Sequence, residues 1–144
     1  MNNYISPIVV RIKRHNGKIV QGCDVYIGRS CNQGGWSLPN SKWNNPYSVK
    51  TFGRQECLLM YENYVRNNSA LVSSLHELSG KVLGCWCKPE NCHGDVLVKL
   101  FNEYFGLRWY LKNYNYSFLK NYSKLQLIII LLPPEYIPIL GSTE

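Results

Sequence analysis

The chain has 144 residues, of which 45% are hydrophobic and 17% are charged, with a formal net charge of +7. This composition is typical of one main globular domain and excludes an intrinsically disordered chain. The longest strongly apolar run, from Leu125 to Leu132, is interrupted by Gln126 and ends at Pro133. It is far shorter than the roughly 20 residues of a membrane-spanning helix, and the N-terminus has no signal pattern. We therefore expect a cytoplasmic protein with no membrane partner.

The first half of the chain predicts two strands, a long loop and a helix. Residues 8–13 alternate apolar and basic side chains, as an edge strand does, and an Asn-Gly turn leads into a second extended segment over 18–27. Residues 29–47 combine turn signals with large aromatic side chains, which is typical of a binding loop. Residues 51–67 carry apolar side chains at helical spacing and predict an amphipathic helix.

The next segment predicts a helix, a strand and a further helix. Ser69 begins a short helix that Gly80 ends. Residues 81–87 form an apolar strand, and residues 93–105 carry one apolar stripe at helical spacing. The two halves together predict a mixture of strands and helices around one core.

The character of the sequence changes after Gly106, which divides the chain into an expected main domain, residues 1–107, and an extension, residues 108–144. No acidic residue occurs from Tyr104 to Pro134, whereas tyrosines there alternate loosely with lysines. This asymmetry indicates an anionic partner, either a nucleic acid or a phosphorylated small molecule, unless the face is merely solvated. Residues 108–124 are the candidate nucleic-acid contact, because rings stack on bases while lysines meet phosphates. An ordinary surface helix is the alternative.

Residues 83–95 are the densest chemical signal in the chain. This run holds three of the six cysteines and one of the three histidines: Cys85, Cys87, Cys92 and His93. It lies between an expected strand and an expected helix, a junction that suits metal binding, a reactive thiolate or anion binding. We expect reduced thiols, because half of the cysteines crowd into one loop and no secretory signal precedes them.

Zinc binding is the first of these three alternatives. Cys85, Cys87, Cys92 and His93 offer the sulfur and nitrogen ligands that zinc favours. Cys85 and Cys87 would face the same side of a strand, but the adjacent Cys92 and His93 cannot easily both turn inward. The chain also lacks a separate C-x-x-C pair to complete the usual zinc module. The sequence therefore leaves zinc open as a cofactor.

A reactive thiolate is the second alternative. Cys92 falls at the expected N-terminus of a helix beside His93, and helix amides and a neighbouring imidazole both lower the pKa of a thiol. Asp95 lies in the first turn of that helix, where the dipole favours a negative charge. If the protein is an enzyme, we expect Cys92, His93 and Asp95 to be its catalytic residues, supported by Cys85 and Cys87. Burial as a small hydrophobic side chain is the alternative for a cysteine.

Anion binding without covalent chemistry is the third alternative. A helix N-terminus offers free amide donors, to which Arg29 and Arg54 could add a clamp for a phosphate or a carboxylate. The Trp43 ring would stack on a base or a sugar, and the Asn45 amide would hydrogen-bond to the polar edge of that ligand. The alternatives are surface arginines and a turn at Pro46 that merely buries Trp43.

Several spaced motifs follow an order shared with a known family. They are, in chain order, Tyr26 to Arg29, Ser41 to Tyr47, Leu83 to Pro89 and Cys92 to Leu97. Over residues 8–105 the chain resembles the domain of unknown function 4326 family, found in bacteria, phages and large DNA viruses. Relatives usually read Trp-Gly-Asn-Pro where this chain has Asn44 in place of the glycine.

The segment from Cys85 to His93 is also similar to the domain of unknown function 488 family, in which the position of Cys87 is commonly glutamate. The similarity implies a small Rossmann-like α/β fold with flanking helices and a Cys-His pair at a helix start. It argues against a purely structural zinc site. Neither resemblance supplies a known reaction, and the C-terminal extension lies outside both.

The sequence favours an α/β domain that binds or processes a nucleotide, a nucleoside or a related phosphorylated metabolite. Cys92 and His93 would react with or grip the ligand, Arg29 would hold its anionic group, and Trp43 with Asn45 would shape the pocket. Two hypotheses compete with this one: a non-catalytic nucleic-acid-binding protein and a zinc-stabilised interaction module. The resemblance extends the expected setting to the cytoplasm of a virus-infected host. Enzymatic activity and oligomeric state are left open.

Overall fold

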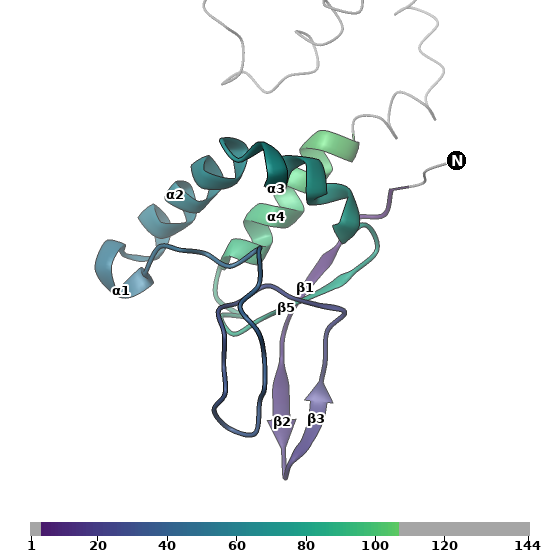
Figure 1. The fold of residues 1–144 in the computed structure, drawn as a ribbon, viewed down its shortest axis with the longest axis vertical. Helices are drawn as coiled ribbons and strands as arrows, with labels where there is room; N and C mark the ends of the chain where they lie inside the picture. The colour runs from purple at the N-terminus through teal and green to yellow at the C-terminus, as the bar shows by residue number, and fades with distance from the viewer. Residues whose placement is uncertain (1–3, 107–144) are drawn as a thin grey trace, which may run out of the picture. The chain divides into compact units, whose positions relative to one another are not determined.

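The computed structural model describes residues 4–106, which form a small parallel sheet with helices packed on it and a hairpin beside it (Figure 1). An α/β fold with a Rossmann-like parallel sheet and flanking helices is thereby confirmed. The expected extension over 108–144 lies outside the described residues, so its nucleic-acid contact over 108–124 stays a prediction. Within residues 4–106, no helix is long and apolar enough to span a membrane.

The sheet has the strand order β1-β5-β4, which places the strand before the cysteine-rich run at its centre. Val82–Cys85 (β5) pairs in parallel with Ile8–Arg11 (β1) on one side and with Val25–Tyr26 (β4) on the other. β5 is buried from Leu83 onward, which explains its apolar sequence. Because the strands are parallel, their carboxyl ends meet at one edge of the sheet.

A two-stranded antiparallel hairpin continues from the end of β1. It is formed by Lys13–His15 (β2) and Lys18–Gln21 (β3). Its turn uses positive φ angles at Asn16 and Gly17, as the Asn-Gly signal predicts. The expected continuous strand over 18–27 is wrong, because the chain leaves the hairpin after Gln21 and enters the parallel sheet only at β4.

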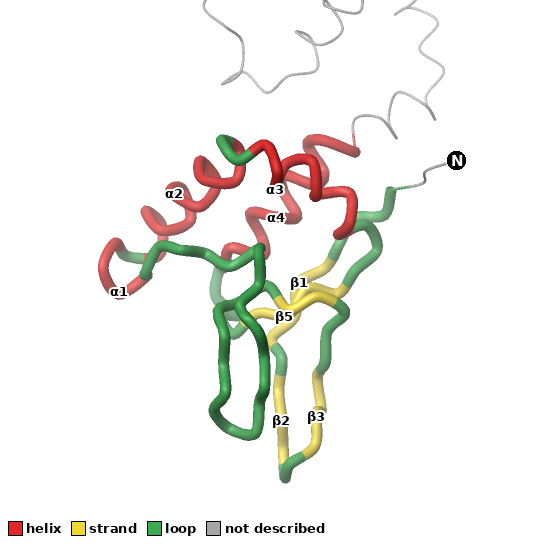
Figure 2. Tube along the Cα trace, in the orientation of Figure 1, coloured by secondary structure: helices red, strands yellow, loops and turns green. Residues whose placement is uncertain are grey.

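The loop over residues 29–47 lies beside the hairpin (Figure 2). The Arg14 guanidinium donates a hydrogen bond to the Gly35 carbonyl and lies 5.4 Å from the centre of the Trp36 ring. Cys31 and Leu38 form an isolated antiparallel bridge within the loop. The expected long loop is therefore held in place by contacts with the hairpin and by the pairing of Cys31 with Leu38 inside the loop.

The helices gather on one side of the sheet (Figure 1). α4 packs on β1 and β5, and α2 packs against α4. On the opposite face, Cys23 and Ile12 cover Gly84 so closely that a side chain there would overlap them. The helices are Val49–Phe52 (α1), Arg54–Arg66 (α2), Ser69–Ser74 (α3), the 3-10 turn Leu75–Leu78 (η1), His93–Phe101 (α4) and the π-helical turn Asn102–Gly106 (η2).

Two expected helices differ in their details from the structure. The helix predicted over 51–67 is divided at Gly53, whose φ of 77° interrupts the helix and lets α2 start in a new direction. The helix predicted over 93–105 is α-helical only to Phe101 and then widens into η2. α3 begins at Ser69 as predicted, and the Asn68 side chain caps it by accepting a hydrogen bond from the Leu71 amide at 3.1 Å.

The core fills the space between β5, α2 and α4. Leu83 from the sheet, Tyr61 and Val65 from α2, and Leu97 from α4 are fully buried in one cluster. Gly94 allows α4 to approach the sheet, because a Cβ atom there would lie 2.8 Å from a methyl group of Val9. This close packing fixes the N-terminus of α4 against the carboxyl edge of the sheet.

Candidate functional site

A pocket of about 470 Å³ opens at the carboxyl edge of the sheet. Its walls are the residues that follow β4, the residues that follow β5, and the first residues of α1, α2 and α4. Open parallel sheets commonly bind ligands at this edge, because loops and helix N-termini converge there. The pocket brings together most of the residues selected from the sequence: Arg29, Asn45, Arg54, Cys85, Cys87, Cys92 and His93.

The lining of this pocket contains arginine and lysine but no carboxylate, and we call it the basic pocket. Arg29, Lys50 and Arg54 line it, and none of its lining residues is Asp or Glu. α2 begins at Arg54 and α4 begins at His93, so the N-termini of two helices lie at the wall. Free amides and the positive ends of helix dipoles reinforce the attraction for an anion.

Three cysteines, Cys85, Cys87 and Cys92, line the wall of the basic pocket. Cys85 ends β5, Cys87 follows two residues later, and Cys92 is the residue before α4. The Cys87 amide lies 3.5 Å from the Cys85 sulfur. Donation from the Cys85 thiol lowers the pKa of Cys87 to about 6, and the Arg54 guanidinium adds to this shift. The same donation raises the pKa of Cys85.

The thiol of Cys92 is also made more acidic, although it is almost completely buried. The pKa of Cys92 is lowered first by the Cys85 thiol, whose single proton can be donated to either Cys87 or Cys92, and then by the main-chain amides of Gly94 and Asp95. The expected neighbour His93 is not among the groups that lower it. Cys92 is only 1% exposed, whereas Cys87 is half-buried. The more accessible thiolate is therefore Cys87, which the sequence suggested as support for catalysis and as a zinc ligand but not as the nucleophile.

His93 lines the basic pocket with a buried, neutral imidazole. Its Nε2 atom lies 2.7 Å from the Ile27 carbonyl oxygen, and its ring meets that of Tyr61 edge to face at 5.2 Å. Burial lowers the pKa of His93, so Nε2 carries the hydrogen and donates it to the carbonyl. Nδ1 is then left as a hydrogen-bond acceptor.

Asp95 does not line the basic pocket, and its contacts belong to the helix end. Its carboxylate accepts a hydrogen bond from the Cys92 amide at 3.0 Å and pairs with the Lys88 ammonium at 2.6 Å. These contacts cap the first turn of α4 and tie the preceding loop to it. The expected catalytic role of Asp95 has no support from this position, which explains the residue as a cap.

The two arginines of the pocket are held by main-chain carbonyls. The Arg29 guanidinium donates from Nε and Nη2 to the Asn45 carbonyl at 3.1 and 2.8 Å, and from Nη2 to the Tyr47 carbonyl at 3.1 Å. Arg54 Nη1 donates to the Asn91 carbonyl at 2.8 Å. Both side chains are thus oriented in advance, while each keeps further N–H groups for a ligand.

Asn45 and Trp43 have mainly structural surroundings. The Asn45 side chain accepts a hydrogen bond from the Tyr47 amide at 2.9 Å and directs its Nδ2 at Cys57. Trp43 is 2% exposed, and its carbonyl accepts a hydrogen bond from the buried Tyr61 hydroxyl at 2.7 Å. Trp43 does not line the basic pocket, so the alternative of a turn that buries this ring describes the structure.

Asn44 fits its turn at the position where the resemblance implies a glycine. Its amide and its Nδ2 both donate to the Ser41 carbonyl, at 3.1 and 2.6 Å. Among the non-glycine residues that the structure describes, only Asn16 has a positive φ. Asn44 therefore replaces the glycine in an ordinary backbone conformation.

The zinc hypothesis finds no ready-made ligand set in the structure. Within residues 4–106, no group of three or more His, Cys, Asp or Glu side chains is placed to hold a metal ion. All six cysteines are free thiols. Zinc binding by Cys85, Cys87, Cys92 and His93 therefore stays a prediction.

Sequence reasoning missed several residues of the pocket, among them Tyr26, Trp86 and Lys50. Tyr26 and Trp86 line the basic pocket as an aromatic pair, and Lys50 adds a third cation. The rings of Tyr26 and Trp86 lie 6.2 Å apart, and the indole N–H donates to the tyrosine hydroxyl at 2.8 Å. Tyr26 and Trp86 lie inside the motifs that carried the resemblance, which was the available signal. No sequence signal marked Lys50.

The fold and this site define a class of protein: a small Rossmann-like α/β domain with a basic, thiol-lined pocket at the carboxyl edge of its sheet. Over residues 10–103 the sequence matches the family described as Domain of unknown function (DUF4326). The chain belongs to this family, as the resemblance indicated.

Two curated relatives are viral proteins of unknown function. The chain is 48% identical over 106 residues to Uncharacterized protein R718 of Acanthamoeba polyphaga mimivirus. This alignment covers 67% of this chain and 80% of the mimivirus protein. It is 33% identical over 110 residues to the Uncharacterized 12.4 kDa protein in nrdA-td intergenic region of Enterobacteria phage T4. That alignment covers 73% of this chain and 90% of the phage protein. No solved structure is significantly similar to the chain.

Proposed function

We propose that the chain binds a nucleotide, a nucleoside or a related phosphorylated metabolite in the basic pocket. The observation that carries this proposal is the lining of the pocket, which contains Arg29, Lys50 and Arg54 and no carboxylate. Phosphate matches such a lining well, because its oxygens accept several charge-assisted hydrogen bonds at once. The N-termini of α2 and α4 supply further donors at the same wall.

The aromatic pair supports a ligand that carries a base as well as a phosphate. Trp86 is 36% exposed and lines the pocket together with Tyr26. Aromatic rings favour stacked or edge-to-face contact with heteroaromatic bases. The pocket volume of about 470 Å³ suits a ligand of nucleotide size, since small-molecule pockets commonly span roughly 300 to 1,000 Å³.

Processing of the ligand would use a thiolate as the nucleophile. In the proposal, Cys92 and His93 remain the pair that reacts with or grips the ligand, and Cys87 joins them as the accessible thiolate. The lowered pKa of Cys87 and of Cys92 supports this assignment, because the thiolate is the reactive form. The proposed setting is the reducing cytoplasm of a bacterial cell or a virus-infected host, which suits six free cysteines.

Calorimetric titration of the full chain with nucleoside 5′-monophosphates tests the proposal. Lys50 is exposed, lines the pocket and has no hydrogen-bond or ion-pair partner among residues 4–106, so Lys50→Gln removes charge without breaking the fold. We expect its Kd to rise roughly three- to ten-fold, the effect of about 1 kcal/mol from one partly exposed charged contact. Lys18→Gln, in the exposed β3 strand, removes the same charge away from the pocket and is the matched control.

Two outcomes would contradict the proposal. One is the absence of binding for every nucleoside monophosphate at millimolar concentration. The other is a Cys92→Ala protein that folds and binds with unchanged affinity, which would remove Cys92 from the site.

A further inference from the structure

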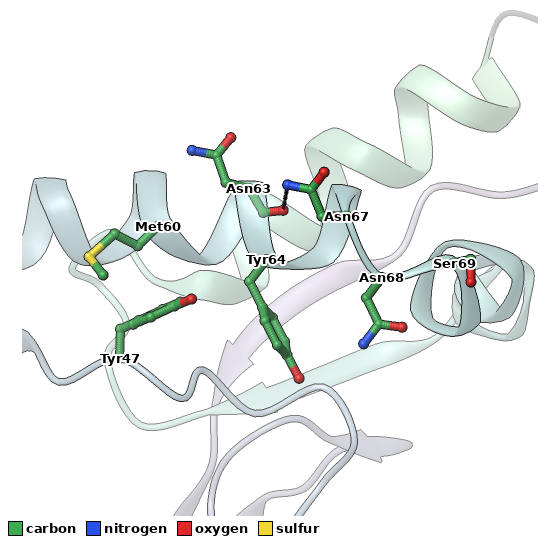
Figure 3. A pocket seen from close by; sticks show the side chains of 7 residues that line it. All are labelled: Tyr47, Met60, Asn63, Tyr64, Asn67, Asn68 and Ser69. Atoms are coloured by element: carbon green, nitrogen blue, oxygen red, sulfur yellow. Dashed lines mark hydrogen bonds between the residues drawn. The ribbon is translucent and has the colours of Figure 1, made fainter.

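A second groove adjoins the basic pocket, and we call it the amide groove. It has a volume of about 610 Å³. Its lining contains aromatic, amide and hydroxyl side chains and no charged residue (Figure 3): Tyr47, Met60, Asn63, Tyr64, Asn67, Asn68 and Ser69. Tyr47 lines both the amide groove and the basic pocket, so the two cavities share a wall.

The amide groove offers ring surface and an unused amide donor side by side. The rings of Tyr47 and Tyr64 lie 6.2 Å apart at an angle of 87°. Figure 3 shows the Asn68 amide directed toward Tyr64. Asn68 uses its Oδ1 atom to cap α3, which fixes the side chain, while its Nδ2 group makes no hydrogen bond among the described residues. A ring surface beside an oriented amide is the combination that binds a base by stacking and by one polar edge.

A series of direct contacts leads from one cavity to the other. Trp86 Nε1 donates to the Tyr26 hydroxyl at 2.8 Å, and that hydroxyl donates to the Arg29 carbonyl at 2.6 Å. The Arg29 guanidinium donates in turn to the Tyr47 carbonyl at 3.1 Å, and Tyr47 meets Tyr64. Arg29 therefore contacts one aromatic pair through its own carbonyl and the main chain of the other pair through its guanidinium.

We infer that the ligand is a dinucleotide or the end of a single-stranded oligonucleotide, with one phosphodiester between two bases. This inference rests on the proposed function and names its ligand class. The phosphodiester lies against Arg29, one base lies on Tyr26 and Trp86, and the other base lies on Tyr47 and Tyr64. A mononucleotide would fill the basic pocket and leave the amide groove without a partner. An alternation of ring, cation and ring matches the alternation of base, phosphate and base in a nucleic-acid strand.

Calorimetry with matched ligands tests this inference on the full chain. The dinucleoside monophosphates ApA and TpT each carry one diester and two bases. The methyl esters of adenosine and thymidine 5′-monophosphate carry the same diester charge and only one base. We expect at least one dinucleoside monophosphate to bind roughly ten-fold more tightly than its methyl ester, the gain of one additional stacked base.

Two variants locate the second base. Asn68→Asp keeps the helix cap, because aspartate also caps helices, but replaces the free amide donor by a carboxylate. Tyr64→Leu removes the ring from the groove while keeping an apolar side chain beside Tyr61. Both variants should bring the affinity of the dinucleoside monophosphate down to that of the methyl ester. Asn16→Asp, at the exposed hairpin turn, adds the same charge and should keep the ten-fold gain.

The outcomes separate this inference from the proposed function. Equal affinity for the dinucleoside monophosphates and their methyl esters would overturn the inference and leave nucleotide binding in place. A ten-fold gain that survives in both Asn68→Asp and Tyr64→Leu would move the second base out of the amide groove and overturn it as well. Absence of binding for all four ligands would also overturn the inference, whereas the proposed function is overturned only if the nucleoside 5′-monophosphates fail to bind as well.

Discussion

The guanidinium of Arg54 donates a hydrogen bond of 2.8 Å to the main-chain carbonyl of Asn91, across 37 positions of the sequence. Arg54 is the first residue of α2, and Asn91 lies just before the cap of α4. This contact joins two helix N-termini at the same pocket wall, in addition to the packing of α2 on α4, and brings a cation to the Cys87 thiol. The basic lining of the pocket therefore depends on a tie between distant segments.

The acidity of Cys87 should depend on Cys85 more than on Arg54. The pKa of Cys87 is lowered to about 6, with the Cys85 thiol as the larger cause and Arg54 as a smaller one. We expect Cys85→Ala to move the pH profile of Cys87 alkylation by iodoacetamide to higher pH, and Arg54→Met to move it less. Peptide mass spectrometry gives the rate for Cys87 alone, and Cys23 in the same digest serves as an internal reference. An unchanged profile in Cys85→Ala would disprove the thiol hydrogen bond.

His93 should make the fold less stable in mild acid. Burial lowers its pKa below the ordinary value of 6.5, so the unfolded chain takes up a proton first as the pH falls. The stabilisation is complete above about pH 6.5 and is lost as the pH falls toward the folded-state pKa. We expect the wild type to lose more unfolding free energy between pH 7 and 5 than His93→Gln, which keeps an N–H group for the Ile27 carbonyl. Urea denaturation followed by circular dichroism measures this, and parallel pH profiles would refute the argument.

Asp95 should act on stability through the cap of α4. Asp95→Ala removes the acceptor for the Cys92 amide, and we expect a loss of about 1 to 2 kcal/mol of unfolding free energy. Lys88→Met is the matched control, because it breaks only the partly exposed ion pair with Asp95 and should cost less than about 1 kcal/mol. Chemical denaturation of both variants at neutral pH makes the comparison. Equal losses would mean that the ion pair, not the cap, is the stabilising contact.

Two tryptophans should separate folding from ligand binding. Trp43 is 2% exposed within the core cluster, so we expect Trp43→Ala to cost about 3 to 5 kcal/mol of unfolding free energy. Trp86 is 36% exposed and lines the basic pocket, so Trp86→Ala should cost less than about 1.5 kcal/mol. We expect Trp86→Ala instead to weaken nucleotide binding roughly ten-fold, measured by calorimetry. A Trp86→Ala protein with unchanged affinity would exclude this ring from the base site.

The sequence predicted most elements of the described fold and the place of the candidate site, because both follow from local patterns. The apolar run before Cys85 and the stripe after His93 identify a strand and a helix without knowledge of any distant contact. The Asn-Gly turn of the hairpin is equally local. The break at Gly53 was missed because a single glycine is tolerated within a helical pattern, while only the backbone angle reveals the change of direction.

The sequence by itself determined that thiols and an imidazole gather at a strand-to-helix junction in a basic chain. Tertiary structure decided which side chains face the pocket, because that depends on neighbours far away in the chain. Trp43 and Trp86 have the same side chain but different surroundings. Trp43 lies in the core, where its carbonyl accepts a hydrogen bond from the Tyr61 hydroxyl, whereas Trp86 follows β5 and lines the pocket. Cys87 likewise owes part of its acidity to Arg54, which no local pattern connects to it. Burial and charge at a site are sums over spatial neighbours, and only the fold specifies those neighbours.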